Sequence, residues 1–276
     1  EKGLGIPLDL SLAFHTDAGI TRNDTAIGTL MIYTIAGLDT QNVFPDGVSR
    51  LANRDLSDIV QTQIVNDIRN LYDSTWTRRQ LMNANYSESA RPNFPSMLLE
   101  LLSHQNFYEL KFELDPRYRF DVSRSIYKGM LKFLSSQYGL EYVVQPLPPT
   151  NFAAELNVNG EVSLSWKAQI DSLESTANAD KFILYTRQGE GGFDNGKIVE
   201  TNNLKLNDLK PGTIYSYKVT ALNNGGESFP TEILSVCWMK NSSEPILIVN
   251  GFDRLTAPAS FDSPTLSGFT NFIDEG

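Results

Sequence analysis

The sequence predicts an α/β domain with a mixed sheet, followed by an all-β sandwich. Two observations carry this prediction. Between residues 51 and 71 apolar residues recur at three- and four-residue spacing, which is typical of an amphipathic helix, and short strand-like apolar runs flank this segment. After residue 146 the pattern changes, and strand-like segments follow one another at intervals of about 8–12 residues with turn residues between them.

The α/β region has recognisable elements along its length. Three strands are expected, at residues 7–14, 28–35 and 96–102, the last of them central to the sheet. A long helix is expected from Ser49 to Leu71. A short helix then precedes a turn at Asp115-Pro116, and a longer helix closes at Gly139. Strands that alternate with helices predict a mostly parallel or mixed sheet.

A proline-rich stretch, "VVQPLPPTNF", marks the boundary between the two regions. We therefore expect domains at residues 1–144 and 145–240, with residues 241–276 forming the start of a further unit or a tail.

The second region resembles a fibronectin type III domain. Trp166 matches the core tryptophan of that family. The run from Leu209 through Pro211-Gly212-Thr213 to Tyr215 matches its turn and tyrosine corner. The resemblance covers about residues 146–240 and implies a sandwich of two antiparallel sheets.

Composition narrows the classes of partner. The 276 residues carry 33 acidic against 23 basic side chains, a formal net charge of −10. That balance argues against nucleic acid and anionic membrane surfaces as partners. No apolar run approaches the roughly 18 residues of a membrane span. Cys237, the only cysteine, lies in an apolar strand-like run, and we expect it to be buried.

Two residues stand out as chemical candidates. His15, one of only two histidines, follows a strand-like run, and it is either a hydrogen-bonded structural residue or a metal ligand. Glu100 lies within the apolar run "SMLLELL", where a carboxylate is costly unless it is paired or hydrogen-bonded. It either faces solvent from an edge strand or acts as a general acid or base with a raised pKa.

Five segments in order resemble the zinc-dependent N-acetylmuramoyl-L-alanine amidases of the cell-wall hydrolase type. They are "LSLAFHTDAG", "GTLMIYTI", "SRLANRDLSDIVQTQIV", "PSMLLELLSHQN" and "LDPRYRFDVSRSIYKGMLKFL". The resemblance implies that His15 binds Zn²⁺ and that Glu100 is the catalytic base. It also implies that the domain is N-terminally incomplete, because the family's other zinc ligands precede this segment.

Three further residues are weaker substrate-binding candidates: Asp17, His104 and Asn106. Asp17 is expected chiefly to cap its loop, and His104 either contacts substrate or hydrogen-bonds the loop with Asn106. Arg78-Arg79 and Arg91 are expected to be exposed loop residues.

The resemblance implies a secreted or cell-envelope enzyme that hydrolyses the amide between N-acetylmuramic acid and L-alanine of peptidoglycan. One alternative is a polysaccharide-processing enzyme of lyase type. The other is a non-catalytic glycan-binding surface protein on an amidase-like fold.

Overall fold

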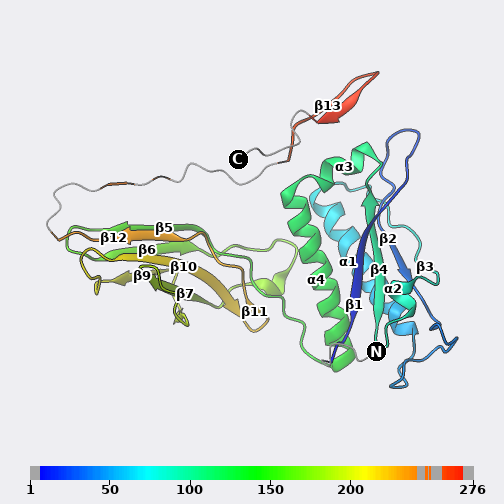
Figure 1. Ribbon diagram of the computed structural model, residues 1–276, viewed down its shortest axis with the longest axis horizontal. Helices are drawn as coiled ribbons and strands as arrows, with labels where there is room; N and C mark the ends of the chain where they lie inside the picture. The colour runs from blue at the N-terminus through cyan, green and yellow to red at the C-terminus, as the bar shows by residue number, and fades with distance from the viewer. Residues whose placement is uncertain (1–6, 241–245, 248, 250–256, 270–276) are drawn as a thin grey trace. The chain divides into compact units, whose positions relative to one another are not determined.

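The computed structural model describes residues 7–240, 246–247, 249 and 257–269. These residues form two compact units, divided between Leu140 and Glu141, and residues 257–269 group with the first unit. The first unit combines a sheet with helices, and the second is built of strands (Figure 1). The predicted fold class, an α/β region followed by an all-β sandwich, is confirmed.

A four-stranded mixed sheet forms the centre of the first unit. Its strands are β1 (Ser11–Asp17), β2 (Leu30–Tyr33), β3 (Met82–Asn83) and β4 (Ser96–Ser103). They lie in the order β1-β4-β2-β3, with β1 parallel to β4 and β2 antiparallel to it. β4 is therefore central, as its apolar sequence predicts.

The described part of the first unit contains four helices. They are α1 (Leu51–Leu71), α2 (Ser87–Ala90), α3 (Phe107–Glu113) and α4 (Pro116–Tyr138). The Asp115 side chain caps α4 by accepting the N–H of Arg117, and Pro116 occupies the first turn. α4 ends at Gly139, whose φ of 63° suits glycine. The predicted turn and helix end are confirmed.

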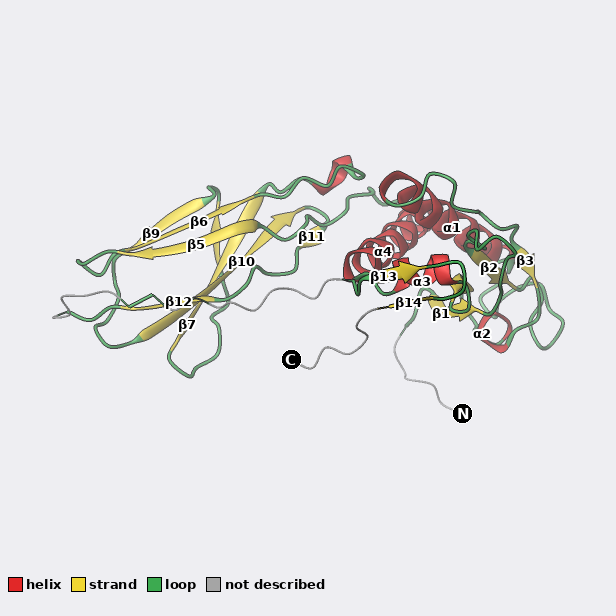
Figure 2. Cartoon of the chain, turned by 90° about the horizontal axis from the view of Figure 1, so that it is seen from above, coloured by secondary structure: helices red, strands yellow, loops and turns green. Residues whose placement is uncertain are grey.

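The long helices α1 and α4 pack together and cover one face of the sheet (Figure 2). Gly129 of α4 permits a close approach, because a Cβ there would lie only 2.8 Å from the Cα of Val60 in α1. The main core contains buried side chains from the sheet and both helices, including Met31, Leu56, Val60, Ile64, Met97, Leu99, Tyr118 and Phe133.

The other face of the sheet carries a smaller apolar cluster of Leu30, Ile32 and Leu98. Its members alternate with core residues along β2 and β4, because successive side chains of a strand point to opposite faces. His15 of β1 and Leu30 of β2 both pair with Glu100 of β4. The three residues therefore form a row across the sheet, and Leu30 joins this row to the cluster.

The second unit is a sandwich of two sheets. One sheet contains β5 (Thr150–Leu156), β6 (Val162–Lys167) and β9 (Asn203–Leu206). The other contains β7 (Lys181–Gln188), β8 (Lys197–Val199), β10 (Ile214–Asn223) and β11 (Gly226–Glu227), with β12 (Leu234–Cys237) paired to β10. A 3₁₀ turn, Ser175–Ala177, lies between β6 and β7.

Two aromatic residues anchor the sandwich as the sequence predicts. Trp166 is 2% exposed and packs edge-on against Phe182, with ring centroids 5.5 Å apart. The Tyr215 hydroxyl accepts the backbone N–H of Lys210 at 3.1 Å, which is the hydrogen bond of a tyrosine corner. These contacts join the two sheets through one core.

A short hairpin follows near the C-terminus, formed by β13 (Ser260–Asp262) and β14 (Ser267–Phe269). The Phe269 ring packs on Phe107 of α3, with centroids 5.4 Å apart. Residues 241–245, within the predicted tail, lie outside the described residues.

Two local predictions are wrong. Cys237 is exposed, because β12 alternates: Leu234 and Val236 are partly buried, Val236 against the core, while Ser235 and Cys237 face solvent. His15 lies within β1, because the strand continues to Asp17. In the described part of the chain, no helix is both long and apolar enough to cross a membrane.

Candidate functional site at the ends of β1 and β4

The site candidates gather where the parallel strands β1 and β4 end, the edge at which α/β sheets bind ligands. His15 pairs with Glu100 and Asp17 pairs with Ser103, so β4 contributes an extra residue between the two pairs. This β-bulge redirects the side chains that follow it. His104 comes directly after β4. The fold thus brings His15, Asp17, Glu100 and His104 to one edge of the sheet.

Glu100 is a half-buried carboxylate in the central strand. Its Oε2 is buried and has no hydrogen-bond partner among the described residues. Burial raises the pKa of Glu100 above its ordinary value, and the negative charge of Asp17 raises it further, while His15 acts in the opposite direction. The edge-strand interpretation is excluded because β4 is paired on both sides.

His15 is exposed beside Glu100 on β1. Its interpretation as a structural residue requires hydrogen-bond partners for the ring, and the described residues supply none to it. The imidazole is therefore accessible to a ligand from solvent.

Asp17 forms an ion pair with Arg79, with Nη1 and Oδ2 separated by 2.6 Å and both side chains about one-third exposed. The hydrogen bond from Arg79 is the largest cause of a lowered pKa for Asp17. The other carboxylate oxygen accepts the N–H of Ala18 at 2.7 Å, which is the expected loop cap. Asp17 therefore caps the loop through one oxygen and binds Arg79 through the other, and its negative charge acts on Glu100.

Arg79 belongs to the site, although the sequence predicts that it is an ordinary exposed loop residue. Its backbone is anchored, since its N–H donates to the carbonyl of Thr29 at 3.0 Å. Its carbonyl also accepts from the Gln61 side chain at 2.9 Å. Sequence alone gives no signal for this pairing, because Arg79 and Asp17 are 62 positions apart.

His104 is tied to β1 by two contacts. Its backbone N–H donates to the Asp17 carbonyl at 3.1 Å, and its Nδ1 lies 3.1 Å from the Thr16 hydroxyl. The ring is exposed at the same edge as His15.

Asn106 occupies a different position from the other candidates. It is 1% exposed and caps α3, with its Oδ1 accepting the N–H of Glu109 and its Nδ2 donating to the carbonyl of Thr25 at 2.8 Å. Its side chain is occupied inside the unit, so it positions the loop after β4.

Glu109 is a buried residue that sequence reasoning missed. It is 0% exposed, and its two carboxylate oxygens accept the N–H groups of Gly28 and Ser103, each at 2.6 Å. Glu109 thereby fixes the end of β4 to the start of β2. The Asn-x-x-Glu spacing of residues 106–109 is close to a capping box and is the signal that draws attention to it.

The resemblance implies a zinc ion, which needs several nitrogen, sulfur or oxygen ligands from nearby side chains. A catalytic zinc site takes three protein ligands. In residues 7–240 and the described residues beyond them, no group of three or more His, Cys, Asp or Glu side chains is arranged to hold a metal. These residues therefore do not by themselves fit a zinc ion, and His15 is the single ligand that the resemblance assigns here.

The comparisons with known proteins concern the second unit. The family model for the fibronectin type III domain matches residues 147–236. This segment is a fibronectin type III domain. The match leaves the α/β unit uncovered, and no curated protein matches the chain.

Several solved structures are similar to part of this chain. The twitchin kinase region from C. elegans is 21% identical, with a TM-score of 0.32, over 37% of this chain and 18% of that one. The FN5 domain of Drosophila Lar is 20% identical, with a TM-score of 0.27, over 34% of this chain and 97% of that one. The chicken CNTN1 FN1–FN3 domains are 21% identical, with a TM-score of 0.29, over 34% and 31%.

Proposed function

We propose that the α/β unit is a cell-wall hydrolase that cleaves the amide between N-acetylmuramic acid and L-alanine of peptidoglycan. The observation that carries the proposal is the buried, unpartnered Oε2 of Glu100 beside the exposed His15, at the end of two parallel strands. The amidase-like order of the sequence segments supports the choice of substrate. A secreted or cell-envelope location is part of the same proposal.

Glu100 supplies the acid–base chemistry in this proposal. With its pKa raised by burial, the carboxylate takes a proton from a water molecule as the water oxygen attacks the amide carbonyl. The C–N bond then breaks, and Glu100 returns the proton to the leaving amine nitrogen. The proton is conserved, and the products are a carboxylic acid and the free L-alanine amine.

Arg79 and His104 are proposed to orient the substrate. Arg79 uses Nη1 in its ion pair with Asp17, and its side chain remains partly exposed. Guanidinium groups bind carboxylates well, and the peptide of the substrate carries them. The His104 ring is exposed as well, and its contact with the Thr16 hydroxyl holds it next to β1.

Zinc enters the proposal as a separate component. His15 would be one ligand, and a complete site would need ligands beyond the described residues. Elemental analysis of the full chain and of His15→Ala tests this component directly. Zinc that the parent holds and the variant loses would support a zinc site at His15. A parent prepared with zinc supplied that still holds none would rule the zinc site out.

The test of catalysis uses purified muropeptides and mass spectrometry of the products. We expect the parent chain to release free L-alanine-terminated peptides, and Glu100→Gln to be at least about 100-fold slower. Glu88→Gln, an exposed residue of α2 with the same chemical change, is the matched control.

Four results would contradict the hydrolase proposal. A parent chain that cleaves no muropeptide, or a Glu100→Gln variant with the parent rate, would remove it. Unsaturated sugar products from a polysaccharide would instead indicate a lyase. Retention on glycan without any cleavage would indicate a binding protein.

A further inference from the structure

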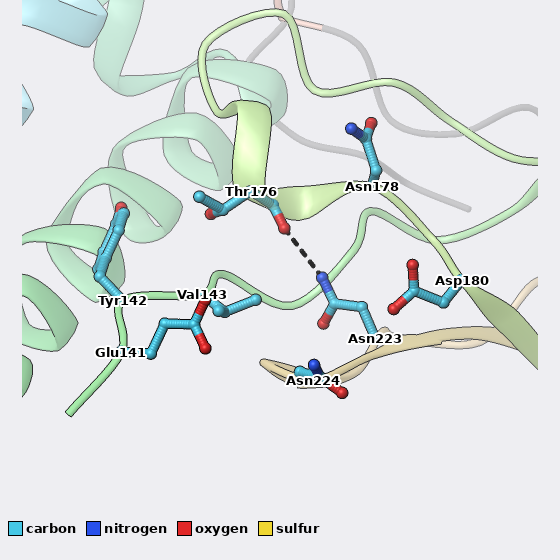
Figure 3. Close-up of a pocket in the computed structure, with 8 residues that line it drawn as sticks. All are labelled: Glu141, Tyr142, Val143, Thr176, Asn178, Asp180, Asn223 and Asn224. Carbon is cyan, nitrogen blue, oxygen red and sulfur yellow. Dashed lines mark hydrogen bonds between the residues drawn. The ribbon is translucent and has the colours of Figure 1, made fainter.

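The fibronectin type III unit contains a small polar pocket of its own, with a volume of about 270 Å³ (Figure 3). All eight lining residues belong to this unit. They come from the segment that precedes β5, from the 3₁₀ turn and the residues that link it to β7, and from the end of β10 and the turn that follows it. Three separate parts of the chain therefore meet around it.

The base of the pocket is held by hydrogen bonds. Asn223 is 9% exposed, and its Nδ2 donates to the carbonyl of Val144 at 2.9 Å and to that of Thr176 at 3.1 Å. The Tyr142 hydroxyl donates to Glu174 at 2.6 Å. These bonds fix the walls before any ligand arrives, which lowers the entropic cost of binding.

The rim offers hydrogen-bonding groups to solvent. Glu141, Asp180 and Asn224 are exposed, and within the described residues their side chains make no hydrogen bond or ion pair. Asn178 donates to the carbonyl of Ser175 at 3.1 Å, which leaves its own carbonyl oxygen as an acceptor. Figure 3 shows Glu141 and Asp180 on opposite sides of Asn223.

The chemistry of the lining selects the class of ligand. An anionic ligand is disfavoured because the lining contains two carboxylates and none of its eight residues is basic. An apolar ligand is disfavoured because most lining side chains are polar. Amides and carboxylates accept hydrogen bonds from hydroxyl groups, and the fixed Tyr142 ring adds apolar surface.

We propose that this pocket binds one sugar unit of an uncharged oligosaccharide through its hydroxyl groups. The proposal does not depend on the hydrolase activity of the first unit. It assigns a sugar-binding role to the fibronectin type III unit.

The test titrates the full chain by calorimetry with two uncharged probes, the β-1,4-linked tetramers of N-acetylglucosamine and of glucose, and with a galacturonic acid trimer. We expect at least one uncharged tetramer to bind and the trimer not to bind. The double variant Asp180→Ala/Asn224→Ala should weaken binding at least tenfold. Asn207→Ala/Asp208→Ala makes the same two changes at exposed positions outside the pocket, and it should bind like the parent.

Circular dichroism of both double variants checks that each is folded. Failure of both uncharged tetramers to bind would overturn the proposal, and so would equal binding by the two double variants. If neither sugar binds but the parent binds calcium, and only Asp180→Ala/Asn224→Ala abolishes that binding, the pocket is a cation site and the sugar proposal is overturned. Loss of sugar binding with muropeptide cleavage intact would separate this site from the proposed active site.

Discussion

Glu100 should make the stability of the first unit depend on pH. Because burial raises its pKa in the folded state, the fold retains this proton to higher pH than the unfolded chain does. Its contribution to stability is therefore fully present below the ordinary carboxyl pKa and is lost as pH rises through the raised value. Replacing Glu100 by an uncharged residue should therefore abolish this fall in stability as pH rises.

We expect Glu100→Gln to be more stable than the parent at pH 7 by up to about 1 kcal/mol, since the amide carries no buried charge. The two proteins should converge at acid pH. Urea unfolding followed by the helical circular dichroism signal measures both values, with Glu88→Gln as control. A variant less stable than the parent at pH 7 would mean that the carboxylate of Glu100 is stabilised by the fold.

At the scale of elements, α1 and α4 are joined by a buried ion pair. Lys128 Nζ lies 2.7 Å from Asp67 Oδ2, with the two side chains 2% and 8% exposed. Ser125 and Gln63 donate to the same oxygen at 2.7 and 2.9 Å. The negative charge of Asp67 is thus neutralised and hydrogen-bonded within the interface of the two helices.

Lys128→Met should lower the free energy of unfolding by about 3 kcal/mol, because it leaves Asp67 buried without a counter-charge. The double variant Lys128→Met/Asp67→Leu should recover most of this loss. Denaturant unfolding of the three proteins measures the effect. Equal stability of Lys128→Met and the parent would show that the pair is not maintained in solution.

Glu109 connects elements as well, since it joins the segment that leads into β2 to the end of β4. A glutamine there can accept only one of the two N–H groups and presents its own N–H₂ to the other. We expect Glu109→Gln to cost about 2 kcal/mol of stability. An unchanged melting temperature in Glu109→Gln, compared with Glu88→Gln, would count against this connecting role.

The extent of successful prediction differs between elements and side chains. The helices α1 and α4 and the central β4 follow from periodicity, capping and apolar runs, which are local signals. The partner of Asp17 depends on the tertiary fold, because Arg79 follows α1 and reaches β1 only when the sheet forms. Cys237 shows a local failure, in which an apolar run hides the alternation of a half-buried strand.

At the scale of the whole molecule, the net charge of −10 sets the range of surfaces that the protein can approach. We expect no binding to duplex DNA or to phosphatidylserine vesicles at physiological ionic strength, because both are anionic. Co-sedimentation and filter binding measure this. Binding that weakens steeply as salt is raised would contradict the expectation and point to a local basic surface.

The pairing of β1 with β4 also bears on how the site is assembled in time. Gly19 and Ser103, which are hydrogen-bonded at the end of these strands, are 84 positions apart. Closing so long a segment costs chain entropy before its contacts compensate, and long-range strand pairing is slow. The helices need only local contacts. During refolding the helical signal should therefore return first, and His15 should meet Glu100 only in the final step, so that a newly made chain is helical before its candidate site is assembled.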